Sequence, residues 1–138
     1  HLYRWLFKFE KDRGNMSSIL MSIKPKFVAE IFSGKKKYEF RKRVCKKKVD
    51  KIIIYSTFPV CKVVGEAEIK NVLIDSPNRV WSITKNYAGI EKKFFDNYFA
   101  NKDVATAYEL TNVKKYPEPK ELSEFGVRVA PQSYQYVD

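Results

Sequence analysis

Histidine and cysteine are scarce in this 138-residue chain, and each scarcity narrows what the protein can do. The sole histidine is His1, so histidine-based acid–base chemistry and most metal sites are not expected. Cys45 and Cys61 are the only cysteines, and neither belongs to a CxxC or Cys/His cluster, which argues against a zinc site or a disulfide scaffold. We therefore expect no metal, no cofactor, and a reduced, intracellular and cytoplasmic setting.

Long apolar runs are missing too: no stretch of about 18 apolar residues occurs, so the sequence predicts no membrane-spanning helix. Residues 1–15 are too charged for a signal peptide, and Gly14 ends their aromatic alternation. We interpret residues 1–17 as an N-terminal arm or an artificially appended segment. Residues 18–138 have the length of one domain, and the 44% hydrophobic content of the chain can form a core.

Positive charge is what the chain has in excess, with a formal net charge of +11. Between Gly34 and Lys48, nine lysines and arginines stand against one acid, Glu39. These cations are Lys35, Lys36, Lys37, Arg41, Lys42, Arg43, Lys46, Lys47 and Lys48. Tyr38 and Phe40 alternate with charged residues, which places rings and charges on opposite faces of a strand. This window favours a phosphate-rich partner, whereas the scattered lysines elsewhere also fit a plain solvated surface.

Apolar patterning and breaker residues divide the chain into short strands and helices. We expect strands at residues 18–23, 37–41, 51–55, 62–73, 104–110 and 113–116, with a closing segment at 127–136. Gly65, inside the fourth of these, predicts a bulge or a close backbone approach.

Helices are expected from Pro25 to an end at Gly34, after a capping Ser76, and over residues 90–99, whose aromatic stripe we interpret as core. The pattern is that of an α+β barrel-like domain, with five or six strands and a few helices packed around it.

Four residues in and beside the charged window have the spacing G-x-K-x-x-E-x-R: Gly34, Lys36, Glu39 and Arg41. Three segments, in order along the chain, resemble the ASCH family (activating signal cointegrator homology), a branch of the PUA-like β-barrels. They are MSIKPKFVAEIFSGKKKYEFRKR, KIIIYSTFPVCKVVGEAEI and APQSYQYV. The resemblance spans residues from 19 to 137. It implies a PUA-like barrel with a cleft, and a role in binding RNA or a modified nucleotide.

The motif residues also have a physical interpretation. Glu39 and Arg41 lie two apart on a strand, hence on one face and close enough to pair. Beside Lys36, such a pair can hold a phosphate through Arg41 and a base edge through Glu39, or it can be an internal ion pair that fixes the barrel. The predicted nucleic-acid-binding set is Lys24, Lys36, Glu39, Arg41, Lys42, Arg43, Tyr55, Ser56, Gln132 and Ser133.

The other members of this set are chosen by position. Lys24 follows the first strand, where it can point into the same cleft or be an ordinary exposed lysine at a helix start. Tyr55, Ser56 and Thr57 end a central strand, a favourable place for a stacking ring and hydroxyl donors, although Tyr55 is equally suited to the core.

Two further groups complete the set. Gln132 and Ser133 lie in the closing segment, where they can read a base or cap a turn. Lys42 and Arg43 begin an exposed basic connection, which would follow a nucleic-acid backbone in a strongly salt-dependent way.

A hydrolase is the alternative function. One ASCH-like branch is an acetylcytidine amidohydrolase with a proposed lysine, threonine and glutamate. Its lysine falls on Lys36, its threonine falls on Glu39, and its glutamate has only Glu66 or Glu68 as candidates here. The missing hydroxyl argues against that reaction. An RNA- or nucleoside-directed hydrolase using Lys36 and Glu39 stays open, because a lysine whose pKa is lowered by burial can transfer protons.

Overall fold

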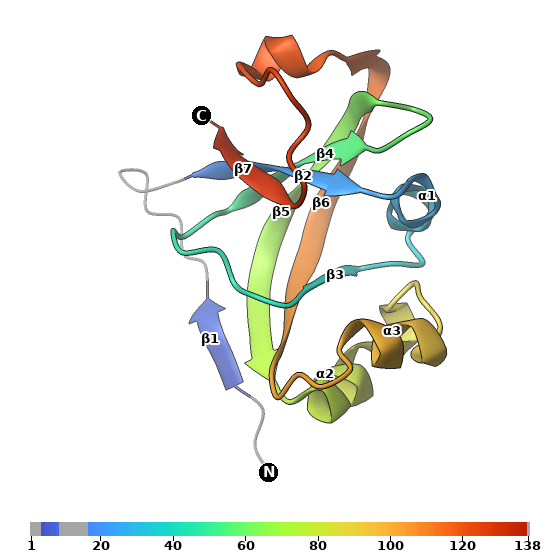
Figure 1. Ribbon diagram of the computed structural model, residues 1–138, viewed down its shortest axis with the longest axis vertical. Coiled ribbons are helices and arrows are strands. Elements are labelled where there is room, and N and C mark those ends of the chain that lie inside the picture. Colours follow the sequence, from blue (N-terminus) through green and yellow to red (C-terminus); the bar gives the residue numbers. More distant parts are fainter. Residues whose placement is uncertain (1–3, 9–16, 138) are drawn as a thin grey trace.

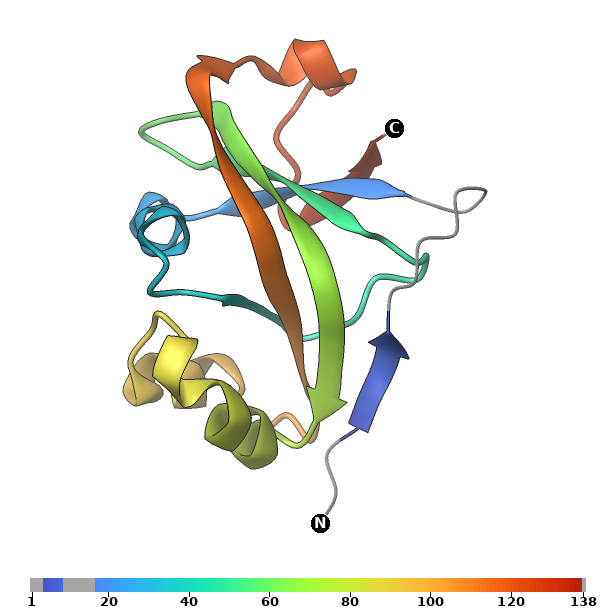
Figure 2. The same cartoon turned by 180° about the vertical axis from the view of Figure 1, so that it is seen from behind.

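One mixed sheet forms the centre of the computed structural model, which describes residues 4–8 and 17–137 (Figures 1 and 2). Its strands are β1 (Arg4–Lys8), β2 (Ser18–Ile23), β3 (Tyr38–Arg41), β4 (Lys51–Ser56), β5 (Lys62–Asp75), β6 (Ala105–Lys120) and β7 (Tyr134–Val137). They follow the order β3–β6–β5–β4–β2–β7, and β1 pairs with β5 off this path. Among the strand pairs of the described ranges, β2 and β4 run parallel and the others are antiparallel.

The parallel pair β2–β4 lies in the middle of the protein. Ile19 and Met21 are fully buried in one apolar cluster together with Ile54, whereas Leu20 and Ile53 pack into another. Strands buried on both faces read as continuous apolar runs rather than as alternating patterns. The predicted strands at 18–23 and 51–55 are therefore confirmed, and the second extends by one residue.

Gly65 lies where β5 changes register with both of its neighbours. A Cβ at this position would lie 2.7 Å from Cζ of Phe32 and would also meet the carbonyl oxygen of Lys114. Glycine is thus required by space, and the predicted bulge with close backbone approach is confirmed.

The region expected to hold two strands, 104–110 and 113–116, forms the single strand β6. The expected break falls at Asn112, which has a positive φ of 48°. The pairing with β5 shifts there, between Thr111 and Lys114. Asparagine tolerates this conformation, so the strand bulges and continues instead of ending.

The helices are α1 (Pro25–Ser33), α2 (Pro77–Thr84) and α3 (Lys92–Tyr98), with short 3₁₀ turns at Lys85–Tyr87 and Leu122–Phe125. The predicted end of α1 is confirmed, because Gly34 ends the helix in the left-handed region with φ of 86°. The predicted cap of α2 is confirmed as well, because the Ser76 side chain accepts a hydrogen bond from Arg79 N at 3.4 Å. None of the helices in the described ranges is long and apolar enough to span a membrane.

Helices α2 and α3 cover an apolar cluster beneath β3, β5 and β6, which includes Phe40, Phe95 and Phe99 (Figure 1). Strands β3 and β7 stand at opposite ends of the sheet order, yet the sheet curls so that both approach the same region, with α1 leading from β2 to β3. The predicted α+β class, a curled barrel-like sheet with six strands beyond residue 17 and a few helices, is confirmed.

Candidate functional site

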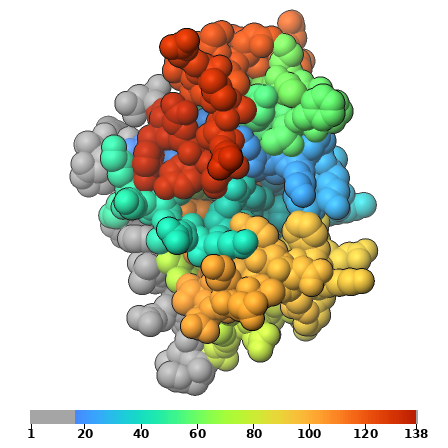
Figure 3. Space-filling view, in the orientation of Figure 1, coloured from blue at the N-terminus to red at the C-terminus, as the bar shows by residue number. Residues whose placement is uncertain are grey.

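A cavity of about 450 Å³ opens where the edge strand β3 faces the end of β2 and the segment before β7. In the space-filling view, β3 and the basic connection after it lie between the C-terminal segment and the α2–α3 region (Figure 3). The cavity is lined by Ser22, Ile23, Lys24, Phe27, Lys36, Glu39, Phe40, Arg41, Thr57, Ile90, Phe94, Tyr98, Gln132 and Ser133. We call it the β3 pocket.

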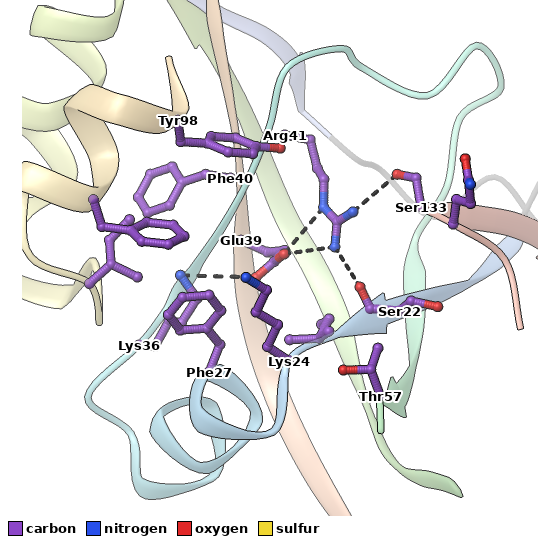
Figure 4. Close-up of a pocket in the computed structure, with 14 residues that line it drawn as sticks. Ser22, Lys24, Phe27, Lys36, Glu39, Phe40, Arg41, Thr57, Tyr98 and Ser133 are labelled. Atoms are coloured by element: carbon purple, nitrogen blue, oxygen red, sulfur yellow. Dashed lines mark hydrogen bonds and ion pairs between the residues drawn. The ribbon is translucent and has the colours of Figure 1, made fainter. Parts of the chain in front are cut away.

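The carboxylate of Glu39 is fixed by Arg41, two residues further along the same face of β3 (Figure 4). Arg41 Nε and Nη2 donate to Glu39 Oε2 at 3.2 and 2.9 Å. Nη2 also donates to the carbonyl oxygen of Ser22 at 3.0 Å, and Nη1 donates to Ser133 Oγ at 3.0 Å. The guanidinium therefore joins β3, β2 and the segment before β7 across the open side of the sheet.

Lys36 is the buried cation of the pocket, with only 2% of the residue exposed. Its Nζ donates to the carbonyl oxygen of Ala88 at 2.9 Å and lies 3.9 Å from Glu39 Oε1. The rings of Phe40 and Phe27 have their centroids 4.7 and 5.5 Å from the same nitrogen. Cation–π attraction and one neighbouring carboxylate thus partly compensate for lost hydration.

Burial shifts the ionisation of this amine. Desolvation lowers the pKa of Lys36 below its ordinary value of 10.5, and the Glu39 carboxylate raises that pKa by a smaller amount. Arg41 lowers the pKa further, because a second cation nearby disfavours the charged form. The pocket therefore holds an amine that releases its proton more readily than a solvated lysine does.

Aromatic and aliphatic side chains form the wall opposite these charges. Phe27 comes from α1, Phe94 and Tyr98 come from α3, and Ile90 precedes α3. The Phe27 and Phe94 rings meet edge to face with centroids 5.2 Å apart, and Phe94 stacks with Tyr98 at 6.4 Å. The pocket consequently combines an apolar, largely aromatic wall with a polar floor, as small-molecule sites commonly do.

The structure brings six of the ten sequence-predicted residues to this pocket. They are Lys24, Lys36, Glu39, Arg41, Gln132 and Ser133. Lys42 lies beside it, with Nζ 4.7 Å from the centroid of Tyr98, and Arg43 is exposed on the connection that follows β3.

Tyr55 and Ser56 do not line the pocket. Tyr55 is 6% exposed and belongs to the apolar cluster of Leu20 and Val63, while Ser56 is 2% exposed. The next residue, Thr57, lines the cavity instead. Tyr55 and Ser56 are still within β4 and are buried, whereas Thr57 is the first residue after the strand ends and is half-buried at the cavity.

The aromatic stripe of α3 corrects one interpretation. The sequence pattern predicts that the whole stripe packs in the core, but of its four rings Phe95 and Phe99 are buried there, whereas Phe94 and Tyr98 are half-buried and line the pocket. The physical reason is helical geometry: positions four apart share a face, and two adjacent rows of this kind point in different directions. Two adjacent aromatic rows in a short helix therefore indicate that one row packs in the core and the other can line a pocket.

Ser22 and Phe27 also belong to the pocket, although no pattern in the sequence indicates a role for either. Ser22 contributes through its backbone carbonyl, and its hydroxyl donates to the Pro131 carbonyl at 2.6 Å. Within residues 4–8 and 17–137, no group of three or more histidine, cysteine, aspartate or glutamate side chains is placed to hold a metal ion.

A curled sheet with helices at its open side and a basic, aromatic-walled pocket there defines the PUA-like class of α+β domains. A family model described as "Domain of unknown function (DUF365)" matches residues 16–137. The chain is also 34% identical, over 100 residues, to an ASCH domain-containing ribonuclease of Zymomonas mobilis. This match covers 72% of the chain and 68% of that relative. The chain belongs to the DUF365 family and is an ASCH domain.

Solved structures agree with this assignment. The crystal structure of ASCH from Zymomonas mobilis superposes with a TM-score of 0.79 and 28% sequence identity, covering 88% of this chain and 87% of that one. The chain is also 32% identical over 129 residues to large ribosomal subunit protein uL22 of Ureaplasma parvum. That match takes in 93% of this chain but spans only 42% of the ribosomal protein.

Proposed function

We propose that the β3 pocket binds a nucleotide of RNA, with the base against the aromatic wall and Glu39 at its polar edge. The observation that carries the proposal is a buried carboxylate held rigidly at the floor of a cavity that also has stacking rings. Glu39 Oε2 is occupied by Arg41, whereas Oε1 lies 3.9 Å from Lys36 Nζ, beyond hydrogen-bonding distance. That oxygen is positioned to accept a hydrogen bond from an exocyclic amino group of a base.

The surroundings of Glu39 support the same proposal. The rings of Phe94 and Tyr98 provide stacking surface, and stacking on an aromatic side chain contributes about 1–3 kcal/mol per base. Lys42 and Arg43 are exposed next to the pocket, in a chain of net charge +11, where they would attract phosphates. Arg41 makes four hydrogen bonds inside the protein, which favours a positioning role over the phosphate contact expected from sequence.

Titration of short single-stranded RNA oligonucleotides at low salt tests this proposal. We expect Glu39→Gln and Tyr98→Ala each to weaken binding about tenfold or more, because one removes the acceptor charge and the other a stacking ring. Glu118→Gln, at an exposed position on β6, is the matched control and should bind as the wild type does. Absence of detectable RNA binding by the wild type at low salt would end the proposal.

RNA cleavage is the second candidate function, and two observations favour it. A relative with 34% identity carries the name ribonuclease, and Lys36 has a lowered pKa in the pocket beside Glu39. A neutral amine there could take a proton from an attacking hydroxyl group. We expect Lys36→Ala to lower product formation at least about a hundredfold, with Lys37→Ala, its exposed neighbour, as the control. RNA recovered intact from the wild type would exclude cleavage.

A further inference from the structure

A second cavity, of about 510 Å³, lies next to the β3 pocket. Phe27, Ile90 and Phe94 line both cavities, so these side chains form a partition between them. The residues that line only the second cavity are Lys26, Glu30, Gly89, Glu91, Lys93 and Asn97. We call it the α1–α3 pocket, because its walls come mainly from the start of α1 and from α3.

The partition is mainly aromatic. It consists chiefly of the edge-to-face pair of Phe27 and Phe94, with ring planes inclined at 71°. Both side chains are half-buried, so each presents surface that the other does not cover. A base on either side would contact the same pair of rings, and neighbouring bases of one strand would then lie in adjacent cavities.

Two lysines, one lining each cavity, have their amino groups close to the rings of the partition. Nζ of Lys24, which lines the β3 pocket, is 5.9 Å from the centroid of Phe94. Nζ of Lys26, which lines the α1–α3 pocket, is 5.6 Å from that same centroid and 5.1 Å from the centroid of Phe27. Both side chains are exposed. The phosphate that links two nucleotides would therefore meet a cation from each side.

The α1–α3 pocket differs in charge from its neighbour. Glu30 and Glu91 balance Lys26 and Lys93, so its lining has no net charge, while Asn97 offers an amide donor and acceptor. Two carboxylates disfavour a phosphate inside the cavity but can accept hydrogen bonds from amino and imino groups. These groups and the shared rings suit an uncharged heterocycle.

From this geometry we infer that the α1–α3 pocket receives the base adjacent to the one in the β3 pocket, so that the protein binds a dinucleotide unit of single-stranded RNA. The linking phosphate lies between Lys24 and Lys26. This inference rests on the proposed function, because the first nucleotide must occupy the β3 pocket.

The test compares ribonucleoside 5′-monophosphates with ribodinucleotides in calorimetric titrations. We expect the wild type to bind its best dinucleotide about tenfold or more tightly than its best mononucleotide. Asn97→Trp, an exposed position whose new ring fills the α1–α3 pocket, should abolish this difference and leave mononucleotide binding within about twofold of wild type. Lys93→Trp is a second blocking variant with the same expectation. Ser82→Trp, exposed on α2 and away from both cavities, is the matched control and should keep the preference.

Failure of this inference can be distinguished from failure of the proposed function. A mononucleotide that binds in a Glu39-dependent way, with no gain for the dinucleotide, would overturn the second site alone. A preference that survives in both blocking variants would overturn it as well. If neither probe binds the wild type, the proposed function and this inference both fall.

Discussion

At the scale of single residues, the β3 pocket keeps an ammonium group and a carboxylate away from most water, since Lys36 is 2% exposed and Glu39 is 6% exposed. Glu39 has a guanidinium in direct contact, whereas Lys36 relies on one carbonyl, two rings and a carboxylate at 3.9 Å. Weaker compensation for lost hydration is the reason that burial dominates the pKa of Lys36.

Stability should therefore depend on pH through Lys36. Its pKa in the folded protein lies below 10.5, the ordinary value, so between the two values the unfolded chain binds more protons. Stability then rises with pH across that interval. We expect the difference in free energy of unfolding, wild type minus Lys36→Met, to increase as the pH is raised from neutrality toward 10.5. Urea denaturation at a series of pH values measures it, and a flat or falling difference would contradict the prediction.

At the scale of elements, the connection between α2 and α3 closes one side of the pocket. It provides the Ala88 carbonyl that accepts from Lys36, and it brings Gly89 against the same side chain. A Cβ on Gly89 would lie 2.6 Å from Cγ of Lys36 and would also meet its Cβ, atoms too close to the backbone to move aside. Gly89 also has a positive φ of 68°.

Comparison of Gly89→Ala with Gly126→Ala should separate these two effects. Gly126 has a similar φ of 71° but open space where a Cβ would be, so its substitution carries only a backbone penalty of about 1–2 kcal/mol. We expect Gly89→Ala to lose about 1–3 kcal/mol more, because Lys36 must leave its site. Chemical denaturation of both variants provides the measurement. Equal losses would mean that the connection does not hold Lys36 in place.

At the scale of the whole molecule, which carries a net charge of +11, the cations that contact phosphates should determine how RNA affinity depends on salt. Lys42 and Arg43 lie exposed beside the pocket, where they can each neutralise a phosphate. For the double variant Lys42→Gln/Arg43→Gln, we expect the slope of log K against log salt to become shallower by about 1–2. Binding isotherms across a salt series give these slopes.

A control with the same loss of charge is Lys102→Gln/Lys120→Gln, at two exposed positions that line neither the β3 pocket nor the α1–α3 pocket. Its slope should stay close to that of the wild type if phosphate contacts are local. Equal changes in both double variants would indicate that only the total charge matters.

The division into an arm at 1–17 and a domain at 18–138 stays a prediction, as do the binding roles of the ten residues.

Local signals in the sequence were enough for much of the fold. Gly34 ends α1, Ser76 caps α2, and Gly65 marks the bulge in β5, because each depends on backbone conformation or on immediate neighbours. The spacing of Glu39 and Arg41 likewise predicted a pair on one face of β3, and the structure has it at 2.9 Å. Such features follow from the two-residue period of a strand and from the stereochemistry of single residues.

What the sequence by itself determined was the class of fold, the basic window and the Glu39–Arg41 pair. Only the tertiary structure decided that Lys36 is buried, that Thr57 rather than Tyr55 faces the cavity, and that one row of α3 aromatics lines it. The pocket is closed by contacts between distant segments, such as Arg41 to a residue 92 positions later in the chain. Periodicity reports which face of an element is apolar, whereas the curl of the sheet determines what that face meets.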